Sequence, residues 1–178
     1  MIRSKLFTTA FLVASVLLGA SCSKTIDVAE ERRSANEAEF RAFADSTGFE
    51  RVTIPGITGT SFVYMKVTKA GDPNVPVDYT DNVHLFRDTY LTSDWRKENW
   101  NARRIHQTLG TNAVPPEAVG SLKIGLQIAV QNLHEGAEAT VVIPWYLNNI
   151  NTTTERTEAY TSLYVRLHLA KVIKPATN

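Results

Sequence analysis

The pattern of apolar and polar residues predicts one amphipathic helix near the start of the chain. Residues from Val28 to Thr47 are rich in charge, and apolar side chains recur among them at helical spacing. Asp27 can cap the first turn, with Glu30 as a capping-box partner, and Gly48 is a natural stop. The recurring apolar residues are Ala35, Ala38, Phe40, Ala42 and Phe43. Such a helix either packs lightly on the rest of the domain or binds a partner.

After Gly48 the spacing changes to the alternation that is typical of β-strands. Runs of alternating apolar and polar residues are separated by turns rich in glycine and proline. The predicted strands cover residues 49–54, 61–68, 81–92, 105–109, 137–143 and 162–172. Residues 111–120 form a predicted loop, and an apolar helix is predicted from Leu122 to Leu133. This order predicts an α+β fold with a mostly antiparallel sheet.

The beginning of the chain has the three-part layout of a secretory signal peptide. Arg3 and Lys5 are followed by an apolar run that ends at Leu18, and small residues lead to Cys22. The run is shorter than the roughly 20 residues that span a membrane. Gly-Ala-Ser-Cys resembles the lipobox of bacterial lipoproteins, although the usual leucine lies one position closer to the cysteine. The resemblance implies cleavage before Cys22 and acylation of that residue, palmitate included, as a membrane anchor.

These signals predict three segments along the chain. Residues 1–21 are the lipoprotein signal peptide, residues 22–48 are the lipidated tether and helix, and residues 49–178 are the folded domain. Without residues 1–21 the chain keeps 17 basic and 18 acidic side chains, a net charge of −1. There is no positive surplus to attract a phosphate backbone, so we expect no nucleic-acid partner.

Residues that could carry metal or cofactor chemistry do not form a known pattern. None of the four histidines stands at a metal-ligand spacing, so we expect no metal and no cofactor. His84 and His168 are expected on the solvent face of strands. Trp145 and Tyr146 follow Pro144, where they either form an exposed aromatic contact pair or cover the end of the sheet.

From residue 109 onward the order of motifs resembles the FKBP-type peptidyl-prolyl isomerases. That family has a Leu-Gly pair, a helix with a Gly-hydrophobic pair, a Gly turn, a strand that ends in Ile-Pro, a loop and an alternating last strand. The matching segments are Leu109-Gly110, Ile124–Leu133, Glu135-Gly136, Val141–Pro144 and Ser162–Leu169, with Asn82–Leu85 similar to the family's second strand. The resemblance covers about residues 60–173 and implies an FKBP-like antiparallel sheet wrapped around one helix.

The resemblance also implies a site, which in this family is an apolar pocket that accepts a proline ring. Rotation of the X-Pro bond crosses a barrier of about 18–20 kcal/mol because it breaks amide resonance. A dry pocket favours the less polar twisted amide, so neither a nucleophile nor a metal is needed. The pocket positions that stay apolar are Trp95, Ile105, Leu122, Leu126 and Val165. These side chains either line a substrate-binding hollow or fill the core, since a fold keeps its apolar positions in both cases.

Other pocket positions depart from the family's pattern. The tyrosine of the second strand falls at Leu85, the acid of the Phe-Asp pair at Arg96, and the tryptophan of the pocket floor at Leu126. The Tyr-Gly pair after Ile-Pro falls at Asn149 and Ile150, and the Ile-Pro-Pro of the lid loop is absent. These changes remove the aromatic platform and two hydroxyls, so they predict weak or lost isomerase activity.

Two functions stay open on the sequence alone. The first is an envelope lipoprotein with an FKBP-type peptidyl-prolyl cis-trans isomerase-like domain of weak or lost activity. The second is a non-catalytic FKBP-like module that binds peptides or serves as an assembly subunit of an envelope complex. In both cases the expected partners are a proline-containing peptide or an envelope protein, and the membrane through the lipid anchor. The expected location is the bacterial cell envelope, with the outer membrane as the site of the anchor.

Overall fold

The computed structural model describes residues 27–56 and 61–176, except for residues 95–96, 101–102 and 156. The predicted signal peptide and Cys22 therefore lie outside the described residues. The helices are α2 (Val28–Arg41), α3 (Ile124–Gln131) and α4 (Trp145–Asn148), with 3-10 turns η1 (Ala42–Asp45) and η3 (Val119–Ser121). No helix among the described residues is both long and apolar enough to cross a membrane.

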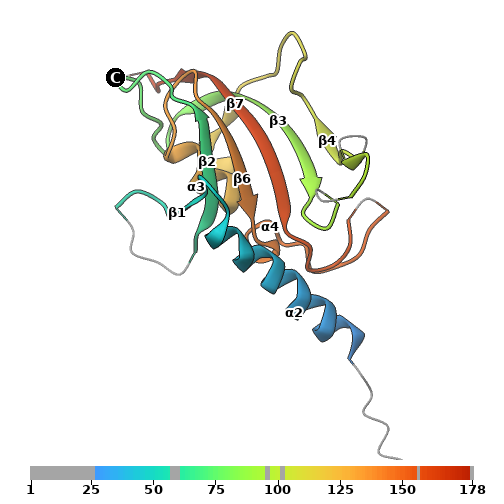
Figure 1. The fold of residues 1–178 in the computed structure, drawn as a ribbon. Helices are drawn as coiled ribbons and strands as arrows, with labels where there is room; N and C mark the ends of the chain where they lie inside the picture. The colour runs from blue at the N-terminus through green and yellow to red at the C-terminus, as the bar shows by residue number, and fades with distance from the viewer. Residues whose placement is uncertain (1–26, 57–60, 95–96, 101–102, 156, 177–178) are drawn as a thin grey trace, which may run out of the picture.

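The strands form one antiparallel sheet, which confirms the predicted α+β fold. Its strands are β1 (Glu50–Val52), β2 (Val63–Lys69), β3 (Asn82–Leu91), β4 (His106–Gln107), β5 (Glu117–Ala118), β6 (Glu138–Ile143) and β7 (Leu163–Ile173). Their order across the sheet is β1-β2-β6-β7-β3-β4, and β5 pairs with β3. The long pairing of β3 with β7 holds the centre of the sheet together. Figure 1 shows these strands running side by side through the middle of the molecule.

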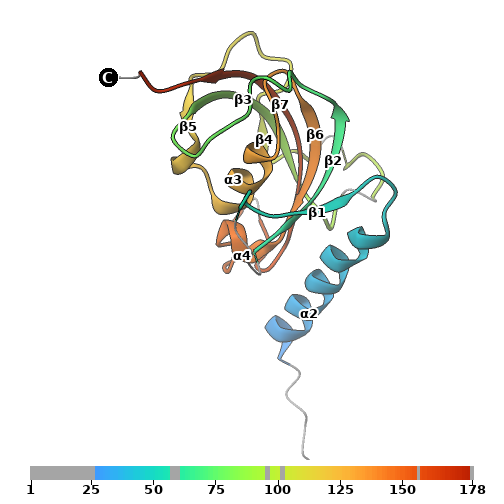
Figure 2. The ribbon, with the colours of Figure 1, turned by 90° about the vertical axis from the view of Figure 1, so that its left-hand side faces the viewer.

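The main hydrophobic core lies between α3 and the curved sheet. Figure 2 shows α3 in the hollow of the sheet and α2 beyond its other face. Ile128 and Val130 of α3 are fully buried, as are Val63, Val141 and Val165 on three neighbouring strands. Burying a side chain of this size stabilises the fold by about 1.5–3 kcal/mol. The sequence places apolar residues at every second position of these strands, and that alternation supplies the face that α3 covers.

Gly125 allows α3 to approach β6 closely. A methyl group added at Gly125 would lie 2.1 Å from Cγ2 of Ile143, which is far inside van der Waals contact. Leu126 follows directly and is buried in the core. The Gly-hydrophobic pair in the helix therefore has a packing cause, since only glycine fits against the strand at this position.

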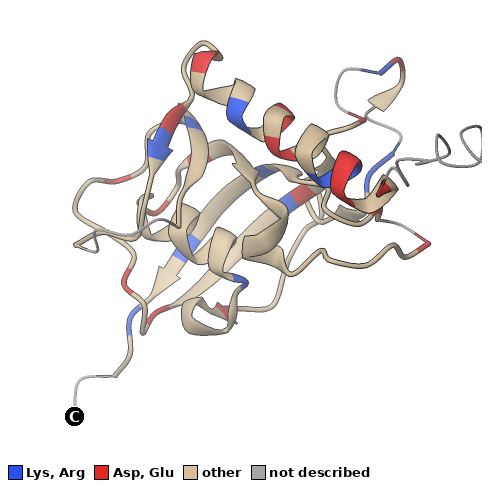
Figure 3. Cartoon of the chain, turned by 90° about the horizontal axis from the view of Figure 1, so that it is seen from below, with Lys and Arg blue, Asp and Glu red and all other residues tan. Residues whose placement is uncertain are grey.

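The other face of the sheet is covered at one end by α2. Asp27 caps this helix as predicted, because its carboxylate accepts hydrogen bonds from the N–H groups of Ala29 and Glu30 at 3.0 and 3.3 Å. The helix ends at Arg41 and continues as the 3-10 turn η1, and Gly48 turns the chain at a positive φ of 79°. Figure 3 shows acidic and basic residues alternating along α2.

An aromatic cluster fixes the C-terminal end of α2 to the sheet. Phe40 and Phe43 are buried against Tyr64 and Val142, with Phe49, Phe62 and Tyr164 around them. The predicted apolar stripe is therefore only partly packed, because Phe40 and Phe43 are buried while its alanines, Ala35, Ala38 and Ala42, are exposed. The helix faces the domain instead through Arg33, Glu37 and Phe40, so its packed face is more polar than the sequence pattern indicates.

Three local predictions need correction. The predicted strand at residues 105–109 shortens to β4, and the predicted loop at 111–120 contains β5 where the chain pairs with the start of β3. The predicted helix from Leu122 begins only at Ile124, because Leu122 and Lys123 are extended after η3. The turn α4 after Pro144 was not predicted; it buries Leu147 in the core beside α3.

Candidate functional site

Three of the predicted pocket residues meet in the main core. Leu122 precedes α3, Leu126 lies in its first turn, and Val165 lies near the start of β7, between Val141 and Thr89 on the two neighbouring strands. Their exposed fractions are 7%, 9% and 1%, and all three belong to the same cluster of buried residues. The structure therefore brings these three residues together in one core, with nearly all of their surface already covered by protein.

Leu85, which stands where the family has the tyrosine of its second strand, is equally buried. Leu85 on β3 is 1% exposed and pairs across the sheet with Leu169. An isobutyl side chain has no group that donates or accepts a hydrogen bond. This position therefore contributes only packing.

Ile105 lies at the edge of the sheet, half-buried, just before β4. Its N–H donates to the carbonyl oxygen of Thr89 at 2.9 Å. Thr89 is also the partner of Val165, so Ile105 and Val165 lie on opposite sides of β3. Trp95 and Arg96 lie outside the described residues. The structure therefore gives the positions of the other predicted pocket residues only.

The loop that replaces the family's lid is closed on itself. Asn149 ends α4 in the left-handed conformation at a φ of 58°, and the N–H of Ile150 donates to the carbonyl oxygen of Trp145 at 3.1 Å. The N–H of Tyr160 then donates to the carbonyl oxygen of Ile150 at 2.8 Å. The rings of Trp145 and Tyr160 meet edge to face at 5.0 Å. These contacts hold the loop through its own residues.

A buried acid on β3 was not singled out by the sequence. Asp88 is buried and accepts hydrogen bonds from Arg104 at 3.1 Å and from the N–H of Leu109 at 3.2 Å. Burial, followed by the negative charge of Asp88, raises the pKa of the neighbouring Tyr90. Asp88 thus holds the segment before Leu109-Gly110 against the sheet, which is a structural role.

The histidines also have structural partners. His84 shares a hydrogen bond of 2.8 Å between Nδ1 and the carbonyl oxygen of Val114, and the ring of His168 stacks on Phe86 at 6.0 Å. Both side chains are half-buried, so they are less exposed than the sequence pattern indicates. Burial, followed by the charge of Arg87, lowers the pKa of His106. Within the described part of the chain, no three His, Cys, Asp or Glu side chains are grouped to hold a metal ion.

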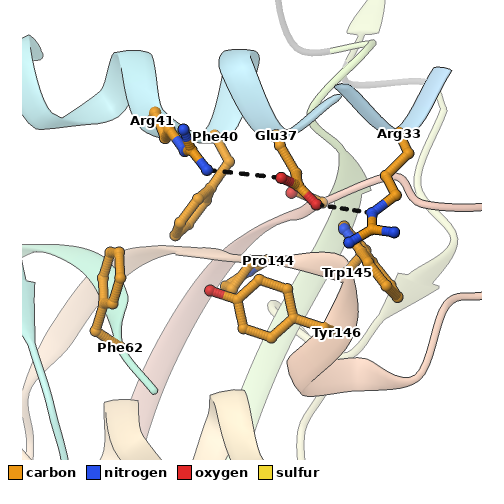
Figure 4. Close-up of a pocket in the computed structure, with 9 residues that line it drawn as sticks. Arg33, Glu37, Phe40, Arg41, Phe62, Pro144, Trp145 and Tyr146 are labelled. Atoms are coloured by element: carbon orange, nitrogen blue, oxygen red, sulfur yellow. Dashed lines mark hydrogen bonds and ion pairs between the residues drawn. The ribbon is translucent and has the colours of Figure 1, made fainter. Parts of the chain in front are cut away.

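A separate cleft lies between α2 and α4, at the end of the sheet where β6 leads into α4. It has a volume of about 330 Å³. Figure 4 shows Phe40, Phe62 and Tyr146 facing this cleft, with Arg33, Glu37 and Arg41 above it. Tyr146 is 40% exposed, which favours the aromatic contact pair over a simple cover for the sheet. The sequence marks Trp145 and Tyr146, but it does not show that α2 lies opposite them.

Comparison with known proteins gives structural matches alone. No protein-family model matches the chain, and no curated protein sequence matches it. FkpA from Escherichia coli superposes with a TM-score of 0.62 at 16% identity, over 97% of this chain and 73% of that one. A peptidyl-prolyl cis-trans isomerase from Pseudomonas syringae superposes at 0.64 with 18% identity, over 84% of this chain and 99% of that one.

A plant structure extends the same likeness. The N-terminal domain of FKBP42 from Arabidopsis thaliana superposes with a TM-score of 0.50 at 16% identity, over 69% of this chain and 99% of that one. At sequence identities this low, a structural match shows a shared fold but does not show a shared activity. The antiparallel sheet, α3 in its hollow and these matches together show that the chain has an FKBP-type fold, divergent in sequence from the proteins that share it.

Proposed function

We propose that this chain is an envelope lipoprotein whose FKBP-type domain has weak or no prolyl isomerase activity. One observation carries the proposal: the pocket positions Leu85, Leu122, Leu126 and Val165 are at most 9% exposed and belong to one continuous core. A proline ring can bind only to apolar surface that is open before it arrives. Side chains that already contact each other offer little such surface.

The chemistry of the remaining positions supports the same proposal. Leu126 provides no indole ring as a floor and no N–H donor, and Leu85 provides no phenolic hydroxyl. Arg96 replaces the family's acid, and a guanidinium stays charged and hydrated at any relevant pH. Catalysis of X-Pro rotation needs a dry pocket that fits the twisted amide. The described residues supply neither the aromatic surface nor the hydrogen-bond donors of that pocket.

The anchor and the location form the second part of the proposal. The Gly-Ala-Ser-Cys context supports acylation of Cys22, which attaches the domain to a membrane of the bacterial cell envelope, with the outer membrane as the expected one. Its partners would then be proline-containing peptides or proteins of that compartment.

A second candidate is a non-catalytic module that binds peptides or takes part in assembly. The observation that favours it is the cleft between α2 and α4, which is lined by aromatic side chains and includes none of the filled pocket positions. On this candidate the FKBP-type core is a scaffold, and binding uses a different surface.

Proline-limited refolding of a model protein tests the proposal. We expect the slow refolding phase to keep its rate when the purified protein is added at one-hundredth to one-tenth of the substrate concentration. The peptidyl-prolyl cis-trans isomerase from Pseudomonas syringae and buffer alone provide the matched comparisons, and each is measured in the same refolding mixture. A strongly accelerated slow phase that is lost in the Trp95→Ala variant would contradict the proposal, because it would mean that a working pocket exists around Trp95.

A further inference from the structure

The cleft between α2 and α4 is built from rings. Phe40 and Phe62 meet at a centroid distance of 5.6 Å, and Trp145 and Tyr146 meet edge to face at 5.7 Å. Pro144 also lines the cleft. Figure 4 shows the ring of Tyr146 lying between Phe62 and Trp145, below Glu37 of α2. A hollow of about 330 Å³ with such walls has room for one or two apolar side chains of a ligand.

Arginine side chains surround this aromatic cleft. Arg33 donates from Nε to Glu37 at 3.1 Å, and the Nη2 atom of Arg41 lies 3.6 Å from the other oxygen of Glu37. Arg33 also lies over the ring of Trp145 at 5.5 Å, and Arg51 lies over the ring of Phe62 at 4.2 Å. Both are within the range of a cation–π contact. Arg33 and Arg41 thus line the cleft itself, and Arg51 lies beside it, against Phe62.

The carboxylates near the cleft do not balance these charges. Glu37 is shared between two arginines, and Glu30 lies 3.8 Å from Arg33 at the solvent side of α2. Arg51 forms no ion pair with any residue that the structure describes. Burial, followed by the charge of Glu37, raises the pKa of Tyr146, and the charges of Arg41 and Arg51 act in the opposite direction. Three arginines and two glutamates therefore lie in or beside the cleft, a surplus of one positive charge that favours a ligand with negative charge.

Unpaired polar atoms lie at and beside the floor of the cleft. Ser162 lines it, is fully buried, and has a hydroxyl with no partner among the described residues. The indole N–H of Trp145, which also lines the cleft, is buried and unpaired in the same way, whereas the unpaired atoms of Asn148 and Thr161 belong to residues outside the cleft lining. Unpaired buried groups are rare and need a cause. The two groups that line the cleft can donate a hydrogen bond, so carbonyl and carboxylate oxygens are the matching acceptors.

We propose that this cleft binds an acidic, extended peptide segment that inserts an aromatic or aliphatic side chain between α2 and α4. The inserted side chain would contact Phe62 and Tyr146, a neighbouring carboxylate would face Arg41 and Arg51, and backbone carbonyls would meet the donors at the floor. This inference deepens the binding-module candidate, on which it rests, by naming its site and the chemistry of its partner. It does not depend on the outcome of the isomerase assay, because none of the described family pocket positions lines the cleft.

Calorimetric titration with short peptides tests the proposal on the full-length protein in detergent micelles. The probe is acetyl-Asp-Phe-Asp-Phe-Asp-amide, with Lys in place of Asp and Ala in place of Phe in the two control peptides. We expect the acidic aromatic probe to bind and both controls to bind at least about tenfold more weakly, because each lacks one of the two contacts. Binding should also weaken as salt is added, since exposed charge pairs are screened.

Protein variants locate the binding site. Arg41 is 75% exposed along its side chain, so Arg41→Glu should leave the fold intact and weaken the probe about tenfold. Tyr146→Ala should weaken it by a similar factor. Arg32→Glu makes the same charge change on an exposed position of α2 that does not line the cleft, and it should leave binding unchanged. Circular dichroism of each variant reports whether the fold is kept.

Several outcomes would overturn the proposal. They are no binding of the probe at millimolar concentration, equal binding of the basic peptide, and equal weakening by Arg32→Glu and Arg41→Glu. The proposal would also fail if the protein bound vesicles of anionic lipid but not the peptide, and if Arg41→Glu abolished the vesicle binding. That result would assign the cleft to a membrane surface. If the same preparation accelerates proline-limited refolding, the isomerase part of the proposed function fails while the peptide result stands.

Discussion

Replacing Phe43 by alanine is expected to lower the free energy of unfolding by about 3–5 kcal/mol. Phe43 is fully buried, and its ring meets Phe49 edge to face at 5.4 Å. It belongs to the cluster that joins the end of α2 to Tyr64 and Val142. Removing the ring leaves a cavity that the surrounding rigid strands cannot fill. Urea unfolding measures the change in free energy, with an unchanged slope as the sign of an intact two-state transition.

A matched substitution separates this effect from a general weakening of the helix. Val28 lies in the same helical segment but is 63% exposed, so Val28→Ala should change the free energy of unfolding by less than about 0.5 kcal/mol. Amide hydrogen exchange along α2 should accelerate in Phe43→Ala and stay unchanged in Val28→Ala. A cost below about 1 kcal/mol for Phe43→Ala would contradict the account of how α2 is attached.

Replacing Cys22 by serine is expected to move the protein from the membrane fraction to the soluble fraction. A serine cannot carry the thioether-linked lipid, and each methylene of a buried acyl chain contributes about 0.8 kcal/mol to membrane binding. The Cys22→Ser variant is exported behind the signal peptide of an ordinary secreted protein, so that cleavage does not require the cysteine. Cell fractionation and mass spectrometry of the N-terminal peptide give the readout.

The control for the anchor is Ser23→Ala, which changes the neighbouring residue and keeps the cysteine. This variant should remain in the membrane fraction with its acyl groups. If Cys22→Ser also remained there after washing with high salt, another anchor would exist, and the proposed lipidation of Cys22 would be wrong.

The elements of the fold follow closely from local sequence. Alternation in β2, β3, β6 and β7 predicts their existence within a few residues, because each has one face on the core and the period of a strand is two. Asp27 and Gly48 mark the ends of the first helical segment, because a cap and a positive φ depend on single residues. The family resemblance placed Leu122, Leu126 and Val165 near one another, and they lie in one core.

The parts that were missed depend on contacts between distant segments. β5 is only two residues long and forms because β3 offers free edge groups, so local spacing contains no signal for it. β4 is shorter than the strand predicted at residues 105–109, because only His106 and Gln107 pair with β3. The predicted apolar stripe of the first helical segment includes alanines and phenylalanines alike, whereas the phenylalanines alone decide its orientation because they bury far more apolar area. The aromatic cleft needs α2 and α4 together, although more than a hundred residues separate them in the chain.

Exchange between the cis and trans forms of a Phe-Pro peptide tests the central claim most directly. Uncatalysed isomerisation takes tens to hundreds of seconds at 25 °C, so two-dimensional NMR exchange spectra with a mixing time of about one second show no cross-peaks between the two forms. With the protein at about one-hundredth of the peptide concentration, we predict that these spectra stay free of exchange cross-peaks. Cross-peaks that grow with protein concentration, and that vanish in Trp95→Ala, would contradict the account, since they would require an open proline-binding pocket in this fold.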